Sequence, residues 1–447
     1  IIVEFPNIKG EIENFVVTEA SVFQKKLQQL YPEIRSYVGV SQESTIRFSV
    51  SPQKGLSLTY ISGENLGFIE KVSNDIYMVY QRSNKDQRVG KFECLTEDFK
   101  QIKSITVDKL KSKDADDSIL RIYLLALSVT AEYTEYHYGG TVGVGQEIAA
   151  KTTALAAMNA TLTRVNGVFE RDFGVRLQLI TNVNDIIFTD PTSDPYSNAS
   201  SLGNWNTELQ NELTVNIGES NYDIGHLFGA SGGGGNAGCI GCVCVDNIKG
   251  SGYTSPVDDI PEGDFFDLDY VSHEIGHQFG ANHTWTTSDS GPSNEGTGAN
   301  LEPGSGSTIM GYAGITTSNV QSQGDDYFHF KSIEQVTTYI KTTSCASETI
   351  LTQNPPTVNA GYDYTIPIST AFVLKGQGTS DGTTTYCWEQ NDEGGNGGVE
   401  TSDPSPTNLT GPMFRSLRPT TSSKRYMPRS EERRVGKECR SRWSPYH

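Results

Sequence analysis

Short hydrophobic runs broken by polar turn residues make up most of the first 107 residues. Runs of β-forming residues at Thr45–Val50, Leu56–Ile61 and Asp75–Gln81 are separated by Ser, Pro, Gly and Asn, which is the pattern of strands joined by turns. A short helix is predicted before them, where Ser21–Gln24 fits a capping box and Pro32 stops the helix. Residues 1–107 therefore predict an independent, strand-rich unit, and no catalytic constellation appears in it.

The hydrophobic pattern changes after this unit. The nearly continuous apolar run Leu120–Ser128 suits a buried strand, and Val175–Ile180 predicts another. Between them, apolar residues recur at alternating spacings of three and four, which predicts a long helix. These helical positions are Leu155, Met158, Leu162, Val165 and Phe169. Strand, crossover helix and strand indicate a βαβ unit in a mixed sheet, hence an α/β (α+β) domain.

A further strand is predicted at Tyr222–Phe228, directly before the glycine-rich loop Gly229–Gly235. The loop lacks the Gly-Lys-Ser/Thr sequence of a phosphate-binding loop, and no helical pattern follows it. We therefore expect it to shape the rim of a cleft rather than to bind phosphate.

Two polar stretches mark the predicted domain boundaries. Residues 108–118 are charged and lack periodicity, which indicates an exposed linker before a domain at 119–350. This linker carries Lys109, Lys111 and Lys113, which would suit a processing protease. The polar stretch Thr352–Thr357 indicates a second linker.

Residues 355–428 carry short alternating runs at Ala371–Leu374 and Thr384–Trp388, with Gly, Asp and Asn between them. This spacing is typical of an Ig-like or PKD-like β-sandwich. The segment is short for such a domain, so we expect an incomplete sandwich.

The final segment, Arg429–His447, resembles the one-frame translation of a common short-read sequencing adapter along its whole length. The composition changes abruptly there, from acidic and rich in Thr, Ser and Pro to dense in arginine. A basic tail usually indicates a nucleic-acid partner, but we interpret this one as foreign to the protein and exclude it from fold and function. Because the chain starts at Ile1 rather than at a methionine, we also expect a signal peptide or a C-terminal sorting element to be missing.

The net charge of −19 over 447 residues favours solubility and argues against nucleic acid or an anionic membrane as a partner. We find no run of ~18 apolar residues that would span a membrane.

The cysteines before the tail are Cys94, Cys239, Cys242, Cys244, Cys345 and Cys387. They are compatible with disulfides in an oxidising compartment. A metal site at Cys239, Cys242 and Cys244 is the less favoured alternative, because no matching Cys/His pair lies nearby at zinc-ribbon spacing.

The segment His273–His283 contains the extended motif H-E-x-x-H-x-x-G-x-x-H. Residues four apart share one face of an α-helix, so His273 and His277 can reach one metal ion. Glu274 lies close enough to hold a water on that metal without being a ligand. Gly280 ends the helix in the left-handed turn that glycine tolerates, and the turn brings back His283 as a third ligand.

Three protein ligands leave one tetrahedral position open for water, which distinguishes a catalytic zinc site from a structural one. The alternative is a buried amphipathic helix that carries histidines by chance. The apolar back of the helix, at Val271, Ile275 and Phe279, is compatible with both interpretations. The glycine and the third histidine favour a zinc hydrolase.

Met310 follows the motif in Ser307–Tyr312 and matches the Met-turn of the metzincins, which forms an apolar floor beneath the histidines. With these motifs, residues 120–350 resemble a reprolysin/adamalysin-like metzincin endopeptidase of the bacterial secreted kind, preceded by a propeptide and followed by an Ig-like domain. Reprolysins usually have Asp after the third histidine, whereas this chain has Thr284. That His-Thr pair also resembles the pappalysin-like metzincins. Tyr312 resembles the astacin and serralysin tyrosine that can touch zinc or the oxyanion.

The resemblance implies a secreted enzyme that hydrolyses proteins or peptides. Zinc on His273, His277 and His283 would activate water, and Glu274 would be the general base. The strand Tyr222–Phe228 would form the upper rim of the cleft and pair with an extended substrate.

The sequence allows more than one interpretation of several other features. Cys94 is a candidate latency switch through a thiolate on zinc, with a buried or paired cysteine as the alternative. Acidic loops are compatible with Ca²⁺, which nothing in the sequence demonstrates, and the oligomeric state is undetermined. A zinc-containing adhesion module without proteolysis is the rival function. The histidines outside the motif, His137, His226 and His329, are interpreted as structural.

Overall fold

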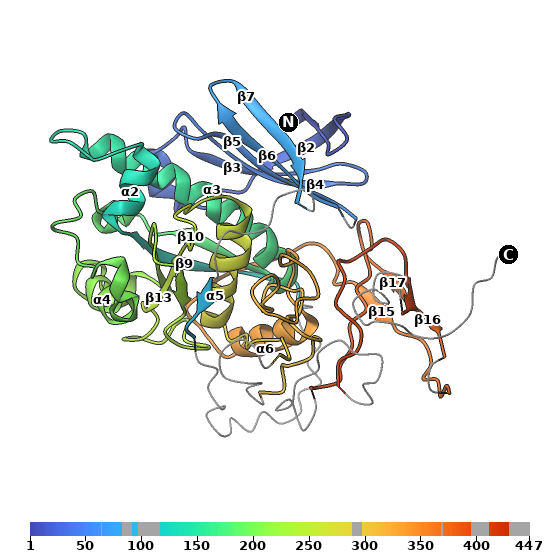
Figure 1. Cartoon of the computed structure of the whole chain (residues 1–447). Helices are drawn as coiled ribbons and strands as arrows, with labels where there is room; N and C mark the ends of the chain where they lie inside the picture. Colours follow the sequence, from blue (N-terminus) through green and yellow to red (C-terminus); the bar gives the residue numbers. More distant parts are fainter. Residues whose placement is uncertain are drawn as a thin grey trace. The chain divides into compact units, whose positions relative to one another are not determined.

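The computed structural model of the chain (Figure 1) describes residues 1–63, 65–82, 92–96, 117–287, 297–367, 370–394 and 411–428. The predicted linker lies outside the described residues except for Asp117 and Ser118, and the segment interpreted as an adapter lies wholly outside them. Two compact units are present: unit 1 comprises 1–97, 109–281 and 333–352, and unit 2 comprises 98–108, 282–332 and 353–447. The first predicted unit thus shares a compact body with most of the metzincin-like region, and the proposed domain boundaries stay predictions.

The N-terminal part of unit 1 is an antiparallel sheet whose seven strands pair in sequence order. Its strands are β1 (Ile2–Pro6), β2 (Ile12–Glu19), β3 (Arg35–Val40), β4 (Thr45–Ser51), β5 (Gly55–Ser62), β6 (Asn65–Ser73) and β7 (Ile76–Gln81). All three strands predicted in this region are present. A core of apolar residues that includes Phe15, Ile46 and Leu58 fills one face of the sheet.

The helix between β2 and β3 begins later than predicted. Helix α1 covers Lys25–Leu30, and its N-cap residue, Gln24, makes no capping bond through its side chain. The hydroxyl of Ser21 donates instead to Oε1 of Gln28 at 2.7 Å. The predicted capping box is therefore wrong, because this serine bonds beyond the first turn of the helix.

The second sheet of unit 1 has the order β10-β9-β11-β13-β12-β8, and β14 pairs with β9. Its strands are β8 (Glu93–Cys94), β9 (Ile119–Val129), β10 (Val175–Leu179), β11 (Ile224–Phe228), β12 (Gly234–Asn236), β13 (Gly252–Ser255) and β14 (Ser347–Ile350). The helices are α2 (Ala131–Tyr138), α3 (Glu147–Phe173), α4 (Trp205–Glu212), α5 (Ser272–Gln278) and α6 (Phe330–Ile340). Short 3-10 and π-helical segments lie at Val183–Ile186, Ala199–Asn204, Leu213–Ile217, Glu219–Asn221 and Phe265–Val271. Strands β9 and β10 are parallel and joined through α3, so the predicted βαβ unit and the mixed α/β class are confirmed for this region.

Strand β11 is not the edge strand expected from the sequence. It pairs in parallel with β9 on one side and β13 on the other, and all five of its residues are buried. Strand β12 lies two positions further out and carries β8 beside it. The predicted rim at Tyr222–Phe228 is therefore wrong, because the pattern of one strand does not reveal which strands pair with it.

Helix α3 lies between the two sheets of unit 1 (Figure 1). Polar pairs connect it to the N-terminal sheet. Arg164 pairs with Glu70 of β6 at 2.7 Å, and Ser36 of β3 donates to Asn159 at 2.8 Å. The N-terminal sheet is therefore attached through specific contacts as well as through apolar packing.

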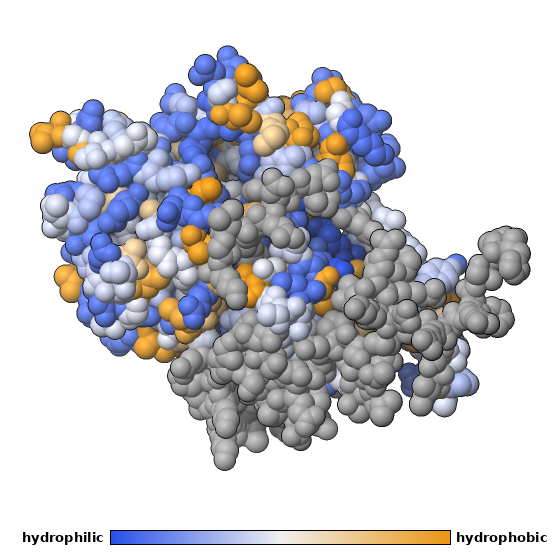
Figure 2. Space-filling model, viewed as in Figure 1, coloured by the Kyte–Doolittle hydropathy of each residue, from blue (hydrophilic) through white to orange (hydrophobic). Residues whose placement is uncertain are grey.

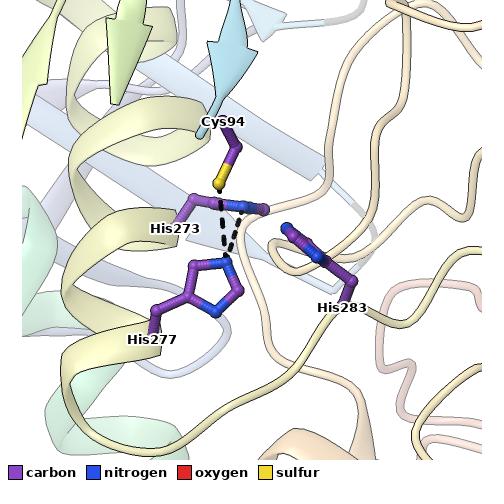
Figure 3. Close-up of side chains that lie close together, drawn as sticks. All are labelled: Cys94, His273, His277 and His283. Carbon is purple, nitrogen blue, oxygen red and sulfur yellow. Dashed lines mark hydrogen bonds between the residues drawn. The ribbon is translucent and has the colours of Figure 1, made fainter. Parts of the chain in front are cut away.

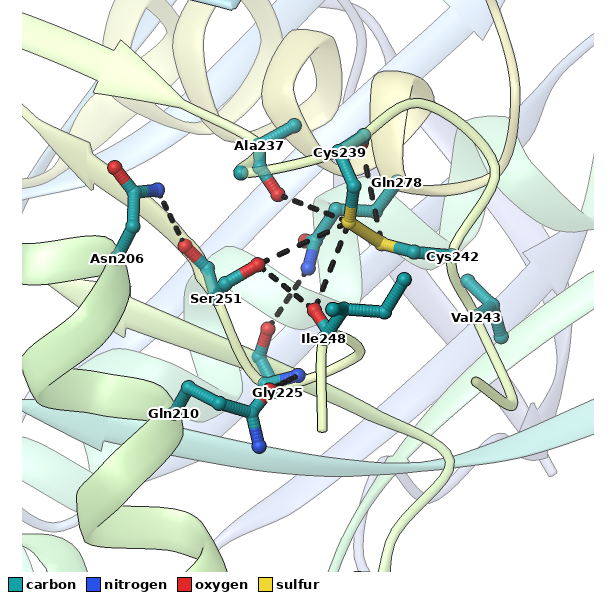
Figure 4. The surroundings of a disulfide bond; sticks show 12 residues. Asn206, Gln210, Gly225, Ala237, Cys239, Cys242, Val243, Ile248, Ser251 and Gln278 are labelled. Carbon is teal, nitrogen blue, oxygen red and sulfur yellow. Dashed lines mark hydrogen bonds between the residues drawn. A yellow bond between two sulfur atoms is a disulfide. The ribbon is translucent and has the colours of Figure 1, made fainter. Parts of the chain in front are cut away.

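Four of the cysteines form two disulfides in unit 1. Cys239 is bonded to Cys242 and Cys244 to Cys345. Figure 4 shows the first of them, with Ser251 and the carbonyl of Ile248 beside the sulfur of Cys239. These bonds confirm the preference for disulfides over a second metal site.

In the described part of residues 355–428, two small antiparallel sheets are present. Strand β15 (Thr357–Asn359) pairs with β17 (Gln377–Thr379), and β16 (Phe372–Lys375) pairs with β18 (Lys424–Met427). The predicted strand Thr384–Trp388 contains only an isolated bridge from Tyr386 to Thr420. The β-sandwich therefore stays a prediction.

On the face shown in Figure 2, hydrophobic and hydrophilic residues are intermixed over the described surface. None of the helices in the described ranges has the length and apolar character needed to cross a bilayer.

Candidate metal centre

Helix α5 presents His273 and His277 on one face. Their Nε2 atoms lie 3.2 Å apart, and both side chains are buried. Val271, Ile275 and Phe279 are fully buried as well, which confirms the apolar back predicted for this helix. A π-helical segment, Phe265–Val271, leads directly into α5, and the sequence pattern did not indicate it.

The C-terminal end of α5 is held in two ways. Gly280 has a φ of +106°, the left-handed conformation expected there. Backbone N–H groups of Gly241 and Cys242 donate to the carbonyls of His277 and Gln278, each at 3.0 Å. The N–H of Gly280 also donates to the carbonyl of His277, at 2.8 Å. The disulfide loop therefore adds donors to the last carbonyls of the helix, which lack partners one turn further along.

The ring of His277 is oriented by the turn that follows the helix. Its Nδ1 lies 2.7 Å from the carbonyl oxygen of Ala281. A carbonyl only accepts, so Nδ1 carries the proton and Nε2 presents its lone pair. This is how histidine ligands of metals are usually oriented.

Cys94, His273, His277 and His283 offer ligand atoms that all lie within 4.8 Å of one another (Figure 3). The Sγ of Cys94 is 3.7 Å from Nε2 of His277. Imidazole nitrogen and thiolate sulfur are the donors that zinc prefers, and four of them suit a tetrahedral site. The donor set therefore fits a zinc ion, with three histidines from the predicted motif and a thiol from β8.

The side chain of Glu274, which also belongs to α5, is fully buried. Its Oε2 accepts a hydrogen bond of 3.0 Å from the hydroxyl of Thr96, which in turn accepts one of 2.8 Å from the backbone N–H of Ala237. A Cβ at Gly235 would collide with the Glu274 carboxyl. Glycine at this position therefore allows β12 to approach the carboxyl group of Glu274.

In unit 2, Tyr312 and Met310 lie close to the third histidine of the motif. The hydroxyl of Tyr312 is 3.1 Å from Nε2 of His283. Met310 is buried, and its carbonyl oxygen accepts a hydrogen bond from the N–H of Thr284 at 3.1 Å. The predicted Met-turn and tyrosine therefore contact the segment that carries His283.

The other histidines have structural surroundings. His226 contacts Gln278 and Thr254, each at 2.8 Å, and burial lowers its pKa to about 4. Burial and the nearby Lys54 lower the pKa of His137 to about 3. Among the described residues, neither these two nor His329 belongs to a group of potential metal ligands.

Thr96 and Glu302 are the two residues of this region that the sequence did not reveal. Thr96 contacts Glu274 from a distant segment, and Glu302 accepts hydrogen bonds from residues on both sides of it in the chain. Neither residue stands in a motif, so no local signal could have identified them.

The sequence profile of the reprolysin-like metallopeptidase family M12B matches residues 119–340. No curated protein matches the chain. Among solved structures, the crystal structure of metalloproteinase-II from Bacteroides fragilis aligns with a TM-score of 0.39 and 10% sequence identity, over 74% of this chain and 89% of that chain.

Proposed function

Because residues 119–340 belong to the reprolysin-like M12B family, the chain is a zinc-dependent metalloendopeptidase, and we propose that His273, His277 and His283 bind the zinc and that Glu274 is the general base. The observation that supports this assignment is the convergence of the three imidazoles beside a buried carboxyl group. The profile match favours the reprolysin-like branch over the pappalysin-like alternative.

Zinc in this site would polarise the scissile carbonyl and lower the pKa of a water molecule. Glu274 would take the proton of that water and deliver it to the leaving amine. The hydroxyl of Tyr312, 3.1 Å from Nε2 of His283, would donate to the developing oxyanion. Met310 would supply apolar packing next to the third ligand.

We further propose that the chain is made as a latent precursor with the segment 92–96 as its inhibitor. Strand β8 of this segment pairs with β12 at the edge of the sheet. Cys94 lies against His277, and Thr96 bonds to Glu274. The segment would therefore block both the metal and the base, and cleavage at the lysines of the predicted linker would release it.

The substrate is a protein or peptide, and we propose that it binds in extended form along β12. Strand β8 pairs with the outer side of β12. Removal of β8 would leave β12 as the edge strand of this sheet. An extended peptide can add to such an edge through backbone hydrogen bonds. Because Gly235 has no Cβ, β12 lies close to Glu274, and a peptide paired with this strand would lie near the proposed base.

We also propose that the enzyme is secreted. The two disulfides support this location, because such bonds persist in oxidising compartments.

The adhesion alternative would require a loss of proteolysis, and the presence of Glu274 disfavours it.

Casein digestion by the full chain after limited proteolysis tests the proposed function. We expect cleavage that a zinc chelator abolishes, and we expect Glu274→Gln to reduce turnover at least ~100-fold because general-base catalysis is lost. The matched control is Glu132→Gln, since Glu132 is exposed on α2. If the Glu274→Gln variant still cleaved casein at the parental rate, another group would have to be the base.

A further inference from the structure

Glu302 is a fully buried carboxylate that the proposed mechanism does not use. Its Oε1 accepts from the backbone N–H groups of Ser307 at 3.0 Å and Thr308 at 3.3 Å. Its Oε2 accepts from the hydroxyls of Thr284 at 2.6 Å and Thr308 at 2.5 Å. One side chain thus connects the residue after His283 with the turn before Met310, and both segments belong to unit 2.

The main chain around Glu302 reinforces this connection. The N–H of Glu302 donates to the carbonyl of Thr284 at 2.9 Å, and the N–H of Thr284 donates to the carbonyl of Met310 at 3.1 Å. A Cβ at Gly306 would lie 3.0 Å from Oε2 of Glu302, and Gly306 has a φ of +65°. The turn is therefore shaped closely around the carboxylate.

Neither connected segment gains much rigidity from secondary structure. Residues 282–287 and 305–312 form no helix or strand, apart from the isolated bridge between Thr286 and Gly304. Burial would raise the pKa of Glu302, but the nearby His329 and the hydrogen bonds from Thr284, Thr308 and Ser307 lower it. Hydrogen bonds to an ionised carboxylate are stronger than those between neutral groups.

We propose that Glu302 is a positioning residue for the third metal ligand: it fixes the segment of His283 against the turn that carries Met310 and Tyr312. Tyr312 lies 3.1 Å from Nε2 of His283, so a shift of either segment would separate the ligand from the hydroxyl beside it. This inference rests on the proposed role of His283 as a zinc ligand.

The test compares Glu302→Gln with Glu389→Gln in the full chain loaded with zinc. Glu389 is also buried in unit 2, but its hydrogen bonds go to the N–H of Phe330 and to the side chain of Cys387 rather than to the His283 segment. A neutral amide offers one acceptor oxygen where two now accept. We expect Glu302→Gln to release zinc to a coloured chelator about 10–100-fold faster, as is typical when a partner that orients a metal ligand is lost.

A second readout separates positioning from general structural damage. After proteolytic activation, kcat of Glu302→Gln should fall while KM stays within about twofold, because Glu302 acts on the metal ligand rather than on substrate binding. Should Glu302→Gln fail to fold, Thr284→Val tests the same connection, since it removes one donor and leaves the carboxylate in place. Thr284→Val should release zinc faster in the same direction, by about tenfold or less.

Unchanged zinc release in a folded Glu302→Gln protein, or in Thr284→Val if Glu302→Gln does not fold, would overturn the inference. An equal acceleration in Glu389→Gln would do so as well, because it would indicate a general loosening of unit 2. His283→Ala distinguishes this failure from failure of the proposed function. If His283→Ala binds zinc as tightly as the parent, the proposed ligand set is wrong. If His283→Ala binds zinc more weakly but zinc release from Glu302→Gln is unchanged, only the role of Glu302 is wrong.

Discussion

At the scale of single residues, Cys94 and Thr96 contact two different functional groups of α5. The thiol faces His277 and the hydroxyl bonds to Glu274. A hydrogen bond to a charged acceptor contributes about 1.5–3 kcal/mol, and 1.4 kcal/mol corresponds to a tenfold change in an equilibrium. We therefore expect Thr96→Val to raise the activity of the uncleaved precursor roughly tenfold or more, and Cys94→Ser to raise it as well.

The measurement is the initial rate of peptide cleavage while gel analysis shows the precursor intact. Thr45→Val, at an exposed position of β4, and Cys387→Ser, at an exposed cysteine outside the disulfides, are the matched controls. If the Thr96→Val and Cys94→Ser precursors cleaved the peptide no faster than these controls, inhibition by the segment 92–96 would be contradicted.

At the scale of elements, the attachment of the N-terminal sheet to α3 depends on a buried arginine. Arg164 pairs with Glu70 of β6 at 2.7 Å and with Asp267 at 3.0 Å. Removing one partner of a buried ion pair costs about 3–5 kcal/mol, because the other charge stays buried without compensation. We expect Arg164→Met to lower the free energy of unfolding by about this amount, measured by urea denaturation.

The control is Arg171→Met on the same helix, whose pair with Asp172 is partly exposed. Such a surface pair contributes at most about 1 kcal/mol. Equal losses in the two variants would show that the Arg164 pairs do not hold the sheet to the helix.

The elements also show where pattern reading succeeds. Strand β9, helix α3 and strand β10 lie where the apolar periodicity predicts them, because that periodicity reflects local geometry. The rim predicted at Tyr222–Phe228 is wrong, because β11 is internal to the sheet. Strand order depends on contacts between distant segments. The alternation of apolar and polar residues within one strand does not show which strands lie beside it.

At the scale of the whole molecule, Asp267 makes stability depend on pH. Burial raises the pKa of Asp267 to about 6, although Arg164 and the hydroxyl of Thr161 lower it and Glu70 raises it. The folded protein therefore binds a proton that the unfolded chain releases near its ordinary pKa of 3.8. This contribution to stability is present below that value and is lost as pH rises through about 6.

Unfolding of the parent and of Asp267→Asn at several pH values checks this dependence. The asparagine does not titrate, so the stability of the parent relative to the variant should decline between about pH 4 and pH 6 and stay level above that range. A relative stability that rises with pH over the same window would show that the pair with Arg164 outweighs burial.

Features that depend on residues close together in the chain follow directly from the amino-acid sequence. The spacing of His273 and His277 follows from the pitch of one helix, and Gly280 ends that helix because its φ is positive. Other features arise only when the chain folds: Cys94 and Thr96 reach α5, Cys244 pairs with Cys345, and Glu302 connects the His283 segment with the Met310 turn. These contacts join residues far apart in the chain. Chain folding brings them together, and no spacing along the sequence encodes such distances.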